Sequence, residues 1–118
     1  MLLQKDERIT VVAEGASGAD AINLAAVHLP DVILMDINMS PVNGFEATRK
    51  IVKSHPNIKI IGVSINNQPS YARNIMNLGA KGYVTKNSSR EEMIEAILQV
   101  HSGKTFICNE VRVKMDEK

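Results

Sequence analysis

Three polar residues of complementary chemistry, Asp36, Ser64 and Lys86, stand at or just beyond the ends of apolar stretches of the chain. A carboxylate, a hydroxyl and an ammonium group held together can accept a phosphoryl group. The carboxylate attacks as the nucleophile and forms an acyl phosphate. The ammonium group pairs with the added charge, and the hydroxyl donates to a phosphoryl oxygen. Taken singly, each residue also has an ordinary interpretation: an aspartate or a serine that ends a strand, or a solvated lysine.

The pattern of apolar residues predicts the elements that position these three side chains. The run at residues 32–35 is apolar on both sides, which is typical of a buried strand in a parallel sheet. Further strands are predicted at residues 9–13, 58–64 and 82–84, with an extended piece at 105–108; helices are predicted at 17–29, 44–54, 69–79 and 88–103, the last opened by a capping box of Ser88 and Glu91. This alternation indicates a doubly wound α/β fold, in which ligands bind beyond the carboxyl ends of the strands.

Composition and charge limit the function classes. A chain of 118 residues with 44% hydrophobic residues predicts one globular domain. The net charge of +1 is spread over both halves, so nothing indicates a surface for nucleic acid or an anionic membrane. No run approaches the roughly 18 apolar residues of a membrane span. Cys108 is the only cysteine, which excludes an internal disulfide and favours the reducing cytoplasm.

Four motifs in order resemble the receiver domain of bacterial two-component response regulators. They are Leu-Met-Asp-Ile-Asn-Met at 34–39, Asn-Gly-Phe-Glu-Ala at 43–47, Val-Ser at 63–64 and Leu-Gly-Ala-Lys-Gly-Tyr-Val-Thr-Lys at 78–86. The resemblance extends from about Ile9 to Ile107 and is closest to the LuxR/NarL-type subfamily, which carries a C-terminal helix-turn-helix domain. It implies a flavodoxin-like sheet and a receiver domain at residues 1–108, and we expect a linker to begin at 109–118.

The resemblance also implies a role for individual residues. Asp36 matches the phospho-acceptor, and Asn38 matches the residue whose backbone carbonyl binds magnesium together with Asp36. Ser64 matches the switch hydroxyl, Tyr83 the aromatic residue that swings inward on phosphorylation, and Lys86 the lysine of the site. The function implied is phosphorylation of Asp36 by a sensor histidine kinase, with transcription controlled through a separate DNA-binding domain. Such a domain is a signalling module and not an enzyme.

Two departures from the family pattern stand out. Ser40-Pro41 replaces the more usual order of proline then glycine, which is a local exchange without a change of length. The family's first strand and the acidic pair that follows it have no counterpart, because Asp6 and Glu7 precede the predicted strand at 9–13. The expectation is therefore a sheet of about four remaining strands and weakened magnesium binding, since magnesium commonly uses one or two carboxylates.

The missing strand allows several explanations. In the family its place is the middle of the sheet, so its loss exposes backbone groups on two neighbours, and we expect a homodimer or a strand-exchanged oligomer to cover them. A start assigned too late, or a shortened version of a longer chain, would explain the same gap.

Other functions remain as alternatives. A degenerate receiver would act as an interaction module without phosphorylation. A phosphohydrolase with an aspartate nucleophile would need a second acid at the position of Asn38, and a flavodoxin-like nucleotide binder would need a glycine-rich loop that the chain lacks.

Overall fold

Parallel strands form the centre of the molecule. The computed structural model describes residue 9, residues 18–37 and residues 44–116. In this part of the chain the sheet has four parallel strands in the order β1-β2-β3-β4, so each strand lies beside its neighbour in sequence. The strands are β1 (Val32–Asp36), β2 (Lys59–Ser64), β3 (Gly82–Thr85) and β4 (Phe106–Ile107).

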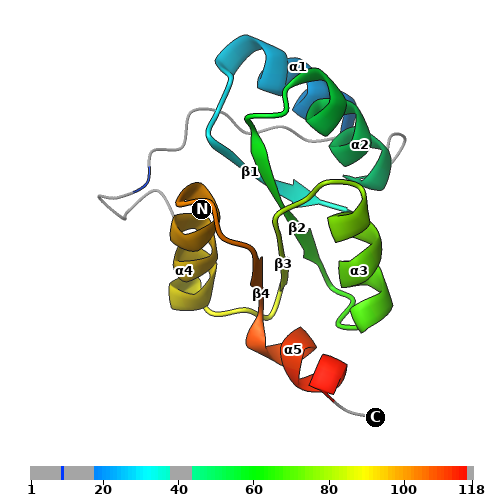
Figure 1. Ribbon diagram of the computed structural model, residues 1–118, viewed down its shortest axis with the longest axis vertical. Coiled ribbons are helices and arrows are strands. Elements are labelled where there is room, and N and C mark those ends of the chain that lie inside the picture. The colour runs from blue at the N-terminus through cyan, green and yellow to red at the C-terminus, as the bar shows by residue number, and fades with distance from the viewer. Residues whose placement is uncertain (1–8, 10–17, 38–43, 117–118) are drawn as a thin grey trace.

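Five helices flank these strands within the residues that the structure describes. They are α1 (Gly18–His28), α2 (Gly44–Ser54), α3 (Pro69–Asn77), α4 (Arg90–His101) and α5 (Asn109–Asp116). Figure 1 shows α4 on one side of the sheet and α2 and α3 on the other, with α1 beside α2. The prediction of a doubly wound parallel α/β fold is confirmed. No helix of the described residues has the length and apolarity needed to cross a membrane.

The centre of the sheet is the most deeply buried part of the core. Ile60 and Ile61 on β2 and Tyr83 and Val84 on β3 have no exposed surface, so β2 and β3 are covered on both faces. This is the arrangement that an unbroken apolar run predicts for a parallel strand. Two side chains of α4, Ala96 and Val100, are also fully buried in this core.

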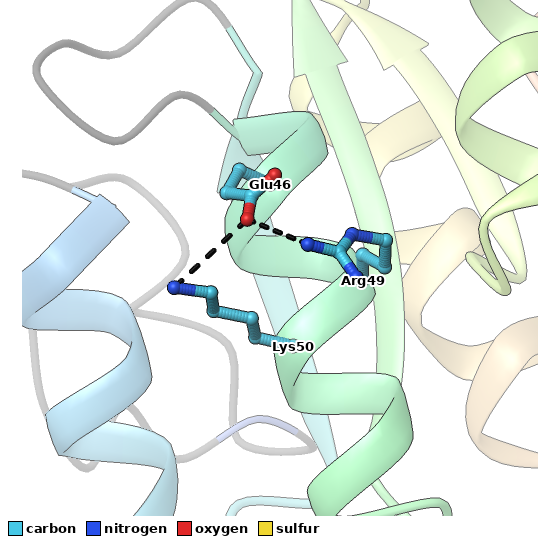
Figure 2. A network of polar contacts seen from close by, with 3 residues as sticks. All are labelled: Glu46, Arg49 and Lys50. Carbon is cyan, nitrogen blue, oxygen red and sulfur yellow. Dashed lines mark hydrogen bonds and ion pairs between the residues drawn. The ribbon is translucent and has the colours of Figure 1, made fainter.

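A small polar cluster lies on the outer surface of α2. The carboxylate of Glu46 accepts a hydrogen bond from Arg49 Nη2 at 2.7 Å and pairs with Lys50 Nζ at 3.9 Å (Figure 2). Both partners lie within one helical turn of Glu46 and about half of each side chain is exposed. Such pairs contribute only a few tenths of a kcal/mol, roughly 0.3–0.5, so packing and not this cluster holds α2 in place.

The helix after β3 begins one residue later than the sequence suggested. Ser89, not Ser88, is the N-cap of α4, and its side chain accepts a hydrogen bond from the backbone N–H of Glu92 at 3.1 Å. Ser88 Oγ instead accepts from the backbone N–H of Thr85 at 3.3 Å, which uses it in the turn after β3. The predicted capping box of Ser88 and Glu91 is therefore wrong by one position.

The C-terminal segment, where a linker is predicted to begin, is helical. Residues 109–116 form α5, although only alternate positions of this stretch are apolar. Val111 is fully buried, and the backbone N–H of Asn109 donates to Glu92 Oε2 on α4 at 2.8 Å. Buried Val111, the partly buried Met115 and polar contacts hold this helix, and no apolar stripe in the sequence predicts it.

Candidate phosphoryl-acceptor site

The site is built where β1, β2 and β3 end. The parallel register pairs Asp36 with Val63 and Ser64 with Thr85, and Lys86 follows Thr85 directly. Two backbone bonds extend the ladders past the strand ends: Ile37 N donates to Val63 O at 3.1 Å, and Lys86 N donates to Ser64 O at 2.8 Å. Asp36, Ser64 and Lys86 therefore lie at one edge of the sheet, as predicted from their positions after three strands.

Asp36 and Lys86 are in direct contact. Lys86 Nζ donates to Asp36 Oδ2 at 2.8 Å, a short distance typical of a charge-assisted bond. The Asp36 side chain is 36% exposed and that of Lys86 46% exposed, so solvent and small reagents reach the carboxylate. A carboxylate that is ionised, accessible and paired with a cation on one oxygen is suited to attack an electrophilic phosphorus.

Ser64 is buried and belongs to a hydrogen-bonded turn. Its Oγ accepts from the backbone N–H of Asn66 at 3.0 Å. Tyr83 lies on the neighbouring strand, fully buried, and its hydroxyl donates to the backbone carbonyl of Asn66 at 2.6 Å. Burial raises the pKa of the Tyr83 phenol above its ordinary value of 10.0, against the opposing effect of a hydrogen bond from Ser64. The side chains of Ser64 and Tyr83 are thus both hydrogen-bonded to the backbone of Asn66.

A second carboxylate next to this loop was not foreseen from the sequence. Glu110 on α5 accepts from Asn67 Nδ2 through one oxygen and from Thr85 Oγ1 through the other, both at 2.7 Å. These two hydrogen bonds hold the pKa of Glu110 below its ordinary value of 4.5. Glu110 lies far along the chain from Asn67, and its segment looked like a polar tail, so no local pattern could have identified the contact.

The predicted metal site is only partly within the described residues. Asn38, the second predicted magnesium ligand, lies outside them, as does most of the strand predicted at 9–13. Within residues 18–37 and 44–116, no group of three or more His, Cys, Asp and Glu side chains is arranged to hold a metal ion. Asp36 alone, with one oxygen already paired to Lys86, does not satisfy the octahedral oxygen coordination of magnesium.

Comparison with known proteins gives a consistent result. The family model of the response regulator receiver domain matches residues 1–98. The chain is 40% identical over 106 residues to the transcriptional regulatory protein DegU of Brevibacillus brevis, covering 90% of this chain and 45% of DegU. It is 38% identical over 110 residues to the response regulator GacA of Pseudomonas aeruginosa, covering 93% of this chain and 51% of GacA.

The fold comparison agrees with the sequence comparison. A two-component response regulator of the LuxR family from an Aurantimonas species superposes with a TM-score of 0.89 at 28% identity, covering 98% of this chain and 86% of the other. This likeness confirms the expected receiver-type fold. The chain spans about half the length of the curated relatives DegU and GacA.

Proposed function

The chain belongs to the response regulator receiver family, and from this premise we propose that Asp36 is its phospho-acceptor. The observation that carries the proposal is the 2.8 Å contact between Lys86 Nζ and Asp36 Oδ2 at the carboxyl edge of the sheet. It supports an acceptor whose negative charge is already balanced by a cation. The comparisons give no support to a receiver that works without phosphorylation.

The proposed reaction is a phosphoryl transfer. The oxygen of Asp36 that is not bound to Lys86 attacks the phosphorus of a phosphohistidine on a sensor kinase. The new P–O bond forms as the P–N bond breaks, and the histidine nitrogen takes the electron pair of the broken bond and a proton from solvent. Lys86 neutralises part of the charge that the acyl phosphate adds, and Ser64 supplies its hydroxyl as a donor to a phosphoryl oxygen.

Magnesium would assist by neutralising phosphoryl charge, as receiver domains generally use it. Asp36 would hold the ion together with water and phosphoryl oxygens, and the further protein ligand that the resemblance implies, the Asn38 carbonyl, lies outside the described residues. The steps proposed here for Asp36, Ser64 and Lys86 therefore involve only side chains of the described residues.

The wider role is inferred from the relatives. Because DegU is a transcriptional regulatory protein of about twice this length, we infer that this receiver controls transcription through a DNA-binding domain elsewhere in a longer protein. The partners in this proposal are a sensor histidine kinase and a second copy of the chain, and the location is the cytoplasm. In this proposal the domain is a signalling module and not an enzyme, and self-phosphorylation and self-dephosphorylation are the most catalysis expected of it.

Beryllofluoride binding tests the proposal because this anion mimics a phosphoryl group on a carboxylate. Thermal unfolding is followed with and without beryllofluoride and magnesium, and the chain should melt at a higher temperature when the anion binds the folded state. Asp36→Asn is expected to abolish the shift, while Glu95→Gln, a change on the outer side of α4, should preserve it. A parent chain that binds no beryllofluoride while folded would contradict the proposal.

A further inference from the structure

The Glu110 carboxylate attaches helix α5 to the loop and strand end beside the phosphoryl site. Glu110 joins three elements: it lies on α5, it accepts from Asn67 in the loop after β2, and it accepts from Thr85 at the end of β3. Thr85 is fully buried and stands one residue before Lys86. Hydrogen bonds to an ionised acceptor are among the stronger ones in proteins, so this contact fixes the loop as well as the helix.

The same loop fixes Ser64. Asn66 donates its backbone N–H to Ser64 Oγ and accepts from the Tyr83 hydroxyl on its carbonyl, and Gln68 N donates to the Asn66 side chain at 2.8 Å. Asn66 thus joins Ser64 to Asn67, which is bonded to Glu110. The backbone N–H, the backbone carbonyl and the side-chain oxygen of Asn66 each take part in one of these hydrogen bonds. A displacement of Ser64 therefore changes the conformation of this turn.

Phosphorylation of Asp36 makes a competing demand on Ser64. A phosphoryl group on that carboxylate requires the Ser64 hydroxyl to move toward it as a donor, whereas in this structure Ser64 Oγ lies in the turn and accepts from the backbone N–H of Asn66. Moving the hydroxyl to the phosphoryl oxygen weakens its bond to Asn66 N, and the turn that presents Asn67 to Glu110 shifts with it. The demand therefore opposes the contact that holds α5.

We propose that Glu110 is a positioning residue that latches α5 to the loop at 64–68, and that phosphorylation of Asp36 opens this latch. The second half rests on the proposed function, and the first half does not. Among the described residues, α5 is also held by buried Val111, by the partly buried Met115 and by the Glu92 contact to Asn109, while Val113 is 51% exposed. Opening is accordingly a local event that leaves the sheet intact.

Amide hydrogen exchange in peptides covering 109–116, measured by mass spectrometry on the full chain, tests the latch. Glu110→Gln keeps the size of the side chain and removes its charge, and exchange in α5 should accelerate by roughly fivefold or more, as loss of a hydrogen bond to a charged acceptor implies. The matched control is Glu95→Gln, whose carboxylate accepts from Gln99 within α4 at 3.1 Å. Equal exchange in the two variants would overturn the proposal.

A second arm tests the link between α5 and Ser64 without any phosphate. Ser64→Ala removes the acceptor of the Asn66 N–H and should accelerate exchange in α5, whereas Ser64→Thr, which retains a hydroxyl, should restore protection. If α5 only packs against the domain and is not coupled to Ser64, neither substitution should change amide exchange in α5. Unaltered α5 exchange in Ser64→Ala would therefore overturn the coupling.

The third arm uses acetyl phosphate and magnesium as the probe, with intact mass reporting the phosphorylated fraction. Faster α5 exchange in the phosphorylated chain supports the latch, and unchanged or slower exchange in a chain that carries the phosphoryl group overturns its opening. If no adduct forms, the proposed function fails and opening by phosphorylation fails with it. The response of α5 to Ser64→Ala then decides whether the latch itself exists.

Discussion

Lys86 Nζ lies 2.8 Å from Asp36 Oδ2, although fifty positions of sequence separate the two residues. The contact exists because β1 and β3 run parallel on either side of β2, so their carboxyl ends face the same edge of the sheet. Substitution of Lys86 by Met should change the free energy of unfolding by less than about 1 kcal/mol, because the pair is partly exposed.

The same substitution should strongly affect phosphorylation. Without the ammonium group, the acyl phosphate loses a charge-assisted bond, and the steady-state phosphorylated fraction should fall by roughly tenfold. Intact mass spectrometry measures the fraction and thermal unfolding measures stability. Lys50→Met is the control, because Lys50 pairs only loosely with Glu46 on α2, and an equal loss in both variants would argue against the role of Lys86.

The start of α4 gives a test of the N-cap. Ser89→Ala should lower the free energy of unfolding by about 1 kcal/mol, because it removes the acceptor for the Glu92 N–H. Ser88→Ala should cost less than about 0.5 kcal/mol, since its hydroxyl makes only a long contact to Thr85 N. Urea denaturation of both variants measures the difference, and a larger loss for Ser88→Ala would restore the capping position expected from the sequence.

Substitution of two glycines with positive φ allows the cost of backbone strain to be compared with the cost of a steric clash. Gly103 has φ 101° and nothing within 4 Å of an added Cβ, so Gly103→Ala should cost about 1 kcal/mol from the left-handed backbone alone. Gly79 has φ 113° and its Cβ would lie 2.6 Å from Val52 Cγ1, so Gly79→Ala should cost at least about 2 kcal/mol.

Val52→Ala offers a check on that interpretation. If the extra loss in Gly79→Ala comes from the valine methyl group, it should shrink in the double variant relative to the sum of the two single changes. Chemical denaturation gives each free energy of unfolding. Strictly additive losses would show that the contact between Gly79 and Val52 is not the cause.

Attachment of α5 should depend on pH through Glu110. The pKa of this carboxyl is lowered in the folded protein, so the ionised form stabilises the fold above the ordinary value of 4.5. That contribution is lost as pH falls below 4.5 and through the folded pKa. Exchange of α5 amides, corrected for the intrinsic rate, should accelerate over this range in the parent chain. In Glu110→Gln it should be fast already and show no such step, and identical profiles would contradict the assignment.

Much of this architecture could be predicted because its signals are local. The apolar runs identified β1, β2 and β3, and Pro69 and Gly79 marked the limits of α3 to within two residues. Ser88 and Ser89 are followed at equal spacing by Glu91 and Glu92, so the sequence offered two registers for one motif, and the bond from Thr85 N to Ser88 decides between them.

The site could be predicted only in part. Asp36 and Ser64 end β1 and β2 and Lys86 directly follows β3, and that placement was enough to bring them to one edge. Helix α5 was missed because a single buried valine and polar contacts from Glu92, Asn67 and Thr85 hold it, none of which has a periodic signature. Contacts of that kind depend on tertiary structure and do not appear in an apolar pattern.

The central claim is that Asp36 accepts a phosphoryl group. The most direct measurement is the intact mass of the chain after incubation with acetyl phosphate and magnesium, beside Asp36→Asn treated in the same way. We expect one phosphoryl adduct on the parent chain and none on the variant. A parent chain that is folded by circular dichroism and gains no mass, or an adduct that persists in Asp36→Asn, would contradict it.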